Sequence, residues 1–208
     1  MEDVLDVYTR PYDPARPLLC LDEASRQILA EVRPPLPPAP GQPARHDPEY
    51  AREGVANLFL VCEPLRGWRE VRVSDRRTRL DWAHCVKDLV DVHYPAAERV
   101  LLVLDQLNTH SPASLYEAFA PAEAKRLAAK LELHHTPKHG SWLNMAELEL
   151  SIRQRQCLDR RLADRPAMER EAAAWTAGRN AATRTIDWRF TTADARIKLR
   201  RLYPAVHA

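Results

Sequence analysis

Three acidic residues, Asp22, Asp105 and Glu147, have the side chains and the sequence surroundings of a metal-dependent active site. Asp105 follows an aliphatic run at residues 100–104, a pattern typical of a buried strand that ends at the rim of a sheet. Asp22 ends another apolar run, and Glu147 lies in the first turns of a predicted amphipathic helix. Three carboxylates brought together repel one another unless divalent cations bind between them. The set therefore predicts a site for two Mg²⁺ ions, which Mn²⁺ could replace.

The chemistry that uses such a pocket is two-metal phosphoryl transfer. One ion activates a water molecule or a 3′-hydroxyl group, and the other stabilises the leaving oxygen. A structural explanation stays open for both aspartates, because Asp105 could cap the turn that follows it and Glu23 beside Asp22 fits a solvated turn. Neighbouring residues on a strand point to opposite faces, so only one of Asp22 and Glu23 can join a common site with Asp105.

Glu147 belongs to a helix that is predicted to begin at Ser141 or Asn144 and to run to about residue 162. The predicted apolar stripe of this helix consists of Met145, Leu148 and Ile152, and Glu147 flanks it. Glu149 lies about 200° further round the helix, at ~100° per residue, so we expect it to face away from the pocket.

The hydrophobic pattern predicts the elements that must hold these acids. Strands are expected at residues 17–22, 57–63, 68–74, 100–105 and 131–136. The connection 64–67 contains Pro and Gly, so the second and third strands should form a hairpin. Further helices are expected at residues 79–93, at 111–130 with a break near Pro121, and at 166–183. This order predicts an α/β domain, and by itself it fits several folds.

Residues 34–48 contain seven prolines in 15 positions, which excludes a helix or a central strand there. The segment is short and lies between two apolar segments, so we expect a rigid surface loop inside a single domain that spans residues 1–208. From about residue 151 the chain is predicted to be helical and is basic, with 13 Lys and Arg against six Asp and Glu. This part either faces a polyanion or forms solvated helix faces.

The composition, with 45 % hydrophobic and 29 % charged residues, is that of a globular chain. The longest apolar runs have five residues, far below the roughly 18–20 that span a bilayer, and the acidic start lacks a signal-peptide core. The four cysteines form no CxxC pair, and the adjacent His134 and His135 diverge on a strand, so no zinc site is predicted. We therefore expect an intracellular protein without membrane association.

A nucleic-acid substrate would explain the basic and polar residues near the predicted pocket. Lys138 and Ser141 would contact phosphates near the scissile bond, and Trp142 would stack or pack beside them. Trp142 could instead be a core residue, Asn144 a helix cap, and His110 a structural hydrogen-bond partner rather than one that orients substrate or a metal-bound water. The residues that we expect to contact DNA are Lys138, Ser141, Trp142, Asn144, His110, Arg153 and Arg155.

Several segments of the chain resemble one protein family, and together they cover nearly all of it. They are Leu21-Asp22-Glu23, residues 57–88, residues 103–110 (VLDQLNTH), residues 135–149 (HTPKHGSWLNMAELE) and the final WRFTTADARIKLRRLYP. On these segments the chain resembles the catalytic domain of the bacterial insertion-sequence branch of the Tc/mariner-like DDE transposases.

The resemblance implies a ribonuclease H-like fold, with a mixed five-stranded sheet of three antiparallel strands followed by parallel strands, flanked by helices. It also implies Mg²⁺-dependent DNA strand cleavage followed by strand transfer. Mapped onto the family motif, the catalytic and metal-binding residues are Asp22, Asp105 and Glu147, with 41 residues between the last two. Gln106 stands where the family usually has Asn, and we expect little effect because both are neutral amides.

The resemblance further implies partners and a cellular setting. The partners would be double-stranded DNA, as element ends and target, and either a second copy of the chain or an N-terminal DNA-binding half. The setting would be the bacterial cytoplasm, in association with the nucleoid. Members normally carry an N-terminal helix-turn-helix region, which we expect to be absent here. The alternatives are a truncated fragment that binds DNA or assists assembly without catalysis, and a ribonuclease H-like nuclease without strand transfer.

Overall fold

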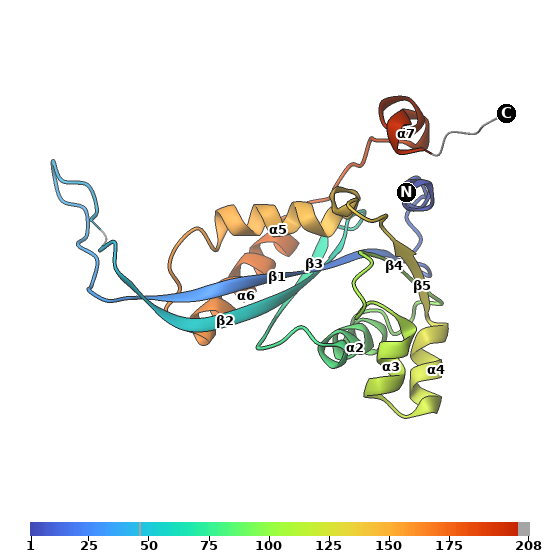
Figure 1. The fold of residues 1–208 in the computed structure, drawn as a ribbon, viewed down its shortest axis with the longest axis horizontal. Coiled ribbons are helices and arrows are strands. Elements are labelled where there is room, and N and C mark those ends of the chain that lie inside the picture. Colours follow the sequence, from blue (N-terminus) through green and yellow to red (C-terminus); the bar gives the residue numbers. More distant parts are fainter. Residues whose placement is uncertain (46, 204–208) are drawn as a thin grey trace.

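A mixed five-stranded sheet organises the chain, with the strands in the order β3-β2-β1-β4-β5 (Figure 1). The computed structural model describes residues 1–45 and 47–203. The strands β1, β2 and β3 are antiparallel, and β4 and β5 continue the sheet in parallel with β1. Their bounds are Leu18–Glu31, Tyr50–Glu63, Trp68–Ser74, Val100–Leu104 and Leu131–His135. The predicted architecture is confirmed.

Strands β1 and β2 are much longer than the apolar runs that predict them. Beyond the main sheet they pair with each other up to Glu31 and Tyr50 and form a two-stranded arm (Figure 1). The proline-rich segment connects them at the end of this arm, with isolated bridges between Leu36 and Arg45 and between Ala39 and Gln42. Residues 34–45 of that segment are exposed, and its residue 46 lies outside the described part of the chain.

Helices cover both faces of the sheet. The α-helices are α1 (Glu2–Tyr8), α2 (Arg79–Asp88), α3 (Pro112–Ala118), α4 (Pro121–Ala129), α5 (Met145–Gln156), α6 (Arg165–Ala181) and α7 (Thr192–Lys198). A π-helical turn extends α2 to His93, and a 3-10 turn at Ser141–Leu143 precedes α5. Helices α2 to α4 pack on one face of the sheet, and α5, with α1 and α7 near its first turn, packs on the other (Figure 1). No helix in residues 1–45 and 47–203 is long and apolar enough to cross a bilayer.

The helix α5 is shorter than predicted, because it ends at Gln156 rather than near residue 162. After this end, the chain contributes Cys157, Leu158 and Leu162 to a separate apolar cluster that packs over the β1–β2 arm. The carbonyl of Leu162 also accepts a hydrogen bond of 3.1 Å from the amide of Leu29 in β1. Packing against the arm therefore competes with continued helix.

Candidate active site

The sequence suggests that Asp22 ends a strand. In the structure it lies within β1. It pairs with Leu60 of β2, while the last pair between β1 and β4 joins Cys20 to Val103. Asp22 is therefore two residues past the point where β1 and β4 part. Its side chain is only 6 % exposed.

Asp105 follows β4 directly and lies beside Asp22. Both residues stand two positions past the paired Cys20 and Val103, and adjacent strands of a sheet are about 4.8 Å apart. Counting in steps of two from that pair, both carboxylates belong to the face of the sheet that α5 covers. The Oδ1 atom of Asp105 accepts a hydrogen bond of 2.9 Å from the amide of Leu107 and pairs with Nδ1 of His110 at 2.7 Å; the same nitrogen lies 3.4 Å from the backbone carbonyl of Asp105.

Glu147 occupies the first turn of α5, three residues after the buried Asn144 that caps this helix. The Asn144 side chain accepts a hydrogen bond of 3.1 Å from the amide of Ala146. Its amide nitrogen donates to the carbonyl of Leu21 at 2.8 Å and to Oδ2 of Asp22 at 3.3 Å. One side chain thus fixes the start of α5 against β1 at Asp22, and Glu147 follows from there on the exposed side of the helix.

The other two acids act electrostatically on Asp22. Burial raises the pKa of Asp22 to about 7, and the negative charges of Glu147 and Asp105 add to this rise. The hydrogen bond from His110 has the opposite effect on Asp105 and holds its pKa below the usual range. Burial alone would lower the pKa of His110, but its hydrogen bonds to Asp105 and Glu23 outweigh this and raise it to about 9.

These observations fit a divalent cation in their chemistry and charge. The donors are carboxylate oxygens, the ligands that hard cations such as Mg²⁺ and Mn²⁺ prefer. A positive charge near Asp22 would relieve the repulsion that raises its pKa. Within the described residues 1–45 and 47–203, no three acidic, histidine or cysteine side chains form a ready-made metal cluster.

A cleft of about 450 Å³ opens beside Asp105. It is lined by Asp105, Gln106, Leu107, Thr136, Pro137, Lys138, His139 and Ser141. The structure thus brings Lys138 and Ser141, two of the expected DNA contacts, into one cleft with a predicted catalytic acid. Trp142 is 44 % exposed and meets Phe190 edge-on, with ring centroids 5.7 Å apart, so it is not a core residue.

Three other expected DNA contacts need correction, because their side chains are buried. Asn144 is fully buried and caps α5, which is the structural alternative that the sequence left open. His110 is 2 % exposed and bonds Glu23 and Asp105 instead of facing the cleft. Arg153 is 2 % exposed and lies on the buried face of α5, whereas Arg155 is exposed and donates to Ser151 at 2.6 Å.

The buried face of α5 differs from the predicted stripe. Leu148 is 44 % exposed, and the buried residues of the helix are Met145, Ala146, Glu149, Leu150 and Arg153. Glu149 does point away from the side of Glu147, but into the interior. There it accepts hydrogen bonds from Arg69 of β3 at 2.6 Å and from Arg179 of α6 at 2.8 and 3.0 Å. The sequence did not predict that these arginines pair with Glu149, because both lie far from it along the chain.

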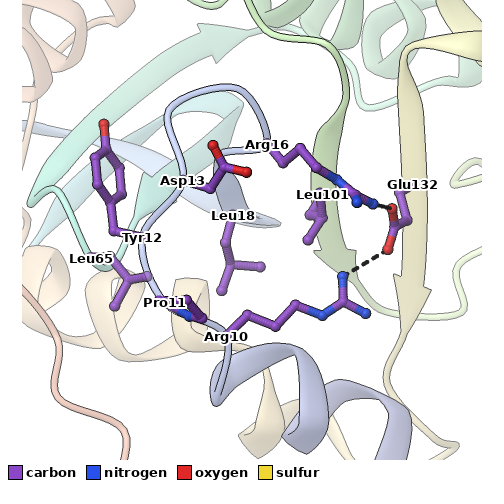
Figure 2. A pocket seen from close by; sticks show the side chains of 9 residues that line it. All are labelled: Arg10, Pro11, Tyr12, Asp13, Arg16, Leu18, Leu65, Leu101 and Glu132. Carbon is purple, nitrogen blue, oxygen red and sulfur yellow. Dashed lines mark hydrogen bonds and ion pairs between the residues drawn. The ribbon is translucent and has the colours of Figure 1, made fainter.

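A different cavity, of about 360 Å³, lies near the beginnings of β1 and β4. Figure 2 shows its lining residues Arg10, Pro11, Tyr12, Asp13, Arg16, Leu18, Leu65, Leu101 and Glu132. The guanidinium groups of Arg10 and Arg16 both donate to Glu132, at 2.9 and 2.5 Å. A single carboxylate thus pairs with both guanidinium groups. None of the three predicted acids lines this cavity.

Comparison with known proteins identifies the family of the chain. Residues 17–169 match the family described as DDE superfamily endonuclease. The chain belongs to this family. Members of the DDE superfamily depend on divalent metal ions. No curated protein sequence shows a significant match.

Two solved structures share the fold of this DDE domain. The crystal structure of the Mos1 strand transfer complex is 16 % identical over 84 % of this chain and 50 % of that chain, with a TM-score of 0.56. The Mos1 transposase paired-end complex with the left transposon end is 14 % identical over 86 % and 55 %, with a TM-score of 0.58. The fold is therefore ribonuclease H-like, as expected. The chain spans about half the length of these two proteins.

Proposed function

We propose that this chain is the catalytic domain of a DDE transposase, which cleaves DNA strands and joins the freed 3′ ends to target DNA. The observation that carries the proposal is the position of Asp22. It is buried next to Asp105 on the neighbouring strand, and its pKa is raised by burial and by the charges of Glu147 and Asp105. Perturbed carboxylates in such an arrangement are typical of functional sites.

In this proposal, Asp22, Asp105 and Glu147 hold two Mg²⁺ ions, or Mn²⁺ in their place. When bound, the ions would supply an activated oxygen nucleophile and stabilise the leaving oxygen. Lys138 and Ser141 line the cleft beside Asp105 and would contact phosphates that flank the scissile bond. Trp142 presents a partly exposed ring next to Ser141 and would stack on a base or sugar there.

The proposed substrate is double-stranded DNA, at the ends of an insertion sequence and at its target. The likeness to two Mos1 complexes, one a strand transfer complex and one with a transposon end, supports DNA as the partner. A second copy of the chain, or an N-terminal DNA-binding half, would complete the assembly. The proposed setting is the bacterial cytoplasm, at the nucleoid.

The variant Asp105→Asn tests the catalytic assignment. It removes one negative charge from the cleft but keeps the shape of the side chain, so we expect Mg²⁺-dependent nicking of a supercoiled plasmid to disappear while the melting temperature stays similar. Asp187→Asn is the control, since its side chain is 73 % exposed and it does not line the cleft around Asp105. Unchanged nicking by Asp105→Asn would refute the assignment.

A marked target plasmid in the same reaction separates the remaining functions. Joined products support a transposase, whereas nicks without joined products indicate a nuclease that only hydrolyses. Should the parent chain neither nick nor join, the N-terminal DNA-binding half is supplied in trans. Continued inactivity then indicates a fragment that binds or assembles without catalysis.

A further inference from the structure

Two buried side chains, those of His110 and Glu23, lie behind the predicted catalytic Asp105 and connect to it. Nε2 of His110 is 2.7 Å from Oε1 of Glu23, and Nδ1 of His110 is 2.7 Å from Oδ1 of Asp105. The side chains of His110 and Glu23 are 0 and 3 % exposed, while that of Asp105 is 38 % exposed. The three side chains therefore lead from the interior to the edge of the cleft.

Alternation along β1 explains why Glu23 can take this place. Asp22 faces α5, so its neighbour Glu23 points to the other face of the sheet, where α2 and α3 pack. The sequence suggests that Glu23 lies in a solvated turn, but its side chain is in the interior. It contributes to the site from behind, through His110.

The ring of His110 is fixed from several sides. It packs against the fully buried Trp82, with ring centroids 5.8 Å apart and a tilt of 34°. The backbone carbonyl of His110 also accepts a hydrogen bond of 3.1 Å from Nε2 of His135 in β5. Each ring nitrogen lies 2.7 Å from a carboxylate oxygen, and Nδ1 is also 3.4 Å from the backbone carbonyl of Asp105, so the ring is held at both ends.

Only one oxygen of Asp105 is used within the chain. Oδ1 accepts the hydrogen bonds from His110 and from the amide of Leu107, and no hydrogen bond to Oδ2 is present among the described residues. Holding Oδ1 from behind orients the carboxylate and leaves Oδ2 for a ligand on the cleft side. Partners that orient a metal-binding carboxylate in this way contribute strongly to metal affinity.

We propose that Glu23 and His110 are positioning residues that hold the Asp105 carboxylate in the orientation required to bind a divalent cation. The inference rests on the proposed function, since it assigns a role to residues that support the same site. It differs from the expected role of His110 as a DNA contact. Glu23 acts at one remove, because it holds His110 rather than the metal-binding acid itself.

Metal binding without DNA tests the inference by a readout other than activity. Isothermal titration of Mn²⁺ into the parent, Glu23→Gln, Glu23→Ala and His110→Asn should show dissociation constants raised by about 10–100-fold in the variants. Glu23→Gln, which keeps an acceptor for His110, should be the mildest. His134→Asn is the matched control, since His134 is also buried and bridges two acids, Asp3 and Glu132, away from the cleft. Its metal affinity should equal that of the parent.

Two further measurements sharpen the outcome. Saturating metal should restore most of the nicking rate of Glu23→Gln, so that the half-saturating metal concentration changes more than the maximal rate. The double variant Glu23→Gln/His110→Asn should be little worse than His110→Asn alone, because both act through one contact. Unchanged metal affinity in folded Glu23→Ala and His110→Asn would overturn the inference. A parent that binds Mn²⁺ but does not nick, even with the N-terminal DNA-binding half supplied in trans, would overturn the proposed function alone, and a parent that binds no metal would overturn both.

Discussion

Asp22 shows at the scale of one residue how the fold prepares a carboxyl group for a cation. Its oxygens have two protein partners, the amide of Glu23 at 2.8 Å and the side chain of Asn144 at 3.3 Å. These contacts do not compensate for burial and for the neighbouring acids, so its pKa rises to about 7. Asp105 has His110 for compensation, whereas no cationic side chain among residues 1–45 and 47–203 pairs with Asp22. A metal ion would supply that positive charge.

This difference predicts a pH-dependent stability of the metal-free protein. The folded state keeps a proton on Asp22 up to about pH 7, whereas the unfolded chain releases it near the ordinary value of 3.8. Between these values the folded state binds more protons, so the Asp22 contribution to the free energy of unfolding falls as pH rises. Asp22→Asn removes this term, and we expect it to stabilise the metal-free protein at pH 7.5 by about 2–4 kcal/mol relative to the parent.

Urea unfolding in the presence of a chelator at pH 4 and pH 7.5 measures the effect. At pH 4 parent and variant should differ much less than at pH 7.5. Added Mn²⁺ should then stabilise the parent and leave Asp22→Asn nearly unchanged. A constant difference between the two proteins at both pH values would contradict the environment described for Asp22.

At the scale of elements, a tight turn sets the position of α5 relative to β5. The amide of Gly140 donates to the carbonyl of Pro137 at 2.8 Å, and the amide of Leu143 donates to the carbonyl of Gly140 at 3.0 Å. Within this turn His139 adopts a left-handed conformation with φ of 62°. A Cβ atom on Gly140 would lie 2.6 Å from Cγ of Pro137. The turn can therefore close this tightly only because residue 140 has no side chain.

Gly140→Ala should disturb this turn and, with it, the start of the helix that carries Glu147. We expect a loss of about 1–3 kcal/mol in the free energy of unfolding and a nicking rate that falls further than the loss of folded protein explains. Gly178→Ala in α6 is the control, since a Cβ there meets nothing within 4 Å. It should be neutral or slightly stabilising. Equal stability and equal nicking in both variants would show that the turn does not position α5.

The elements also show how far the sequence predicts the structure. Alternating or continuous apolar patterns gave β3 its bounds and placed β4 and β5 within one residue at each end. They missed the extension of β1 past Asp22, because residues 24–31 contain only a three-residue apolar run at 28–30 and are ordered by pairing with β2. The site likewise combines local and long-range features. Local motifs predict Asp105 as a site residue, whereas the link between Glu23 and His110 spans 87 positions and depends on the folded sheet.

At the scale of the whole molecule, a buried ion cluster joins elements that are distant in sequence. Glu149 of α5 lies between Arg69 of β3 and Arg179 of α6, and Arg69 and Glu149 are at most 1 % exposed. Next to the cluster, the side chain of Asn180 bonds both the amide and the carbonyl of Arg69, at 2.7 and 2.8 Å. The outer strand of the sheet is thereby attached to α6, and both are attached to the helix that carries Glu147.

Glu149→Gln tests whether this cluster holds the site together. It leaves two arginines without their counter-charge, and removing one partner of a buried ion pair costs about 3–5 kcal/mol. Glu169→Gln is the matched control, because Glu169 pairs with Arg165 at 2.8 Å but is 48 % exposed, and such pairs contribute roughly 0–1 kcal/mol. Thermal unfolding should therefore show a large decrease in melting temperature for Glu149→Gln and a small one for Glu169→Gln. Because Glu149 faces away from the cleft, the loss of nicking caused by Glu149→Gln should match the loss of folded protein. It should largely disappear at low temperature, where the variant is folded. A loss of nicking that persists in fully folded Glu149→Gln would instead place Glu149 in the catalytic machinery and show that the assigned faces of α5 are wrong.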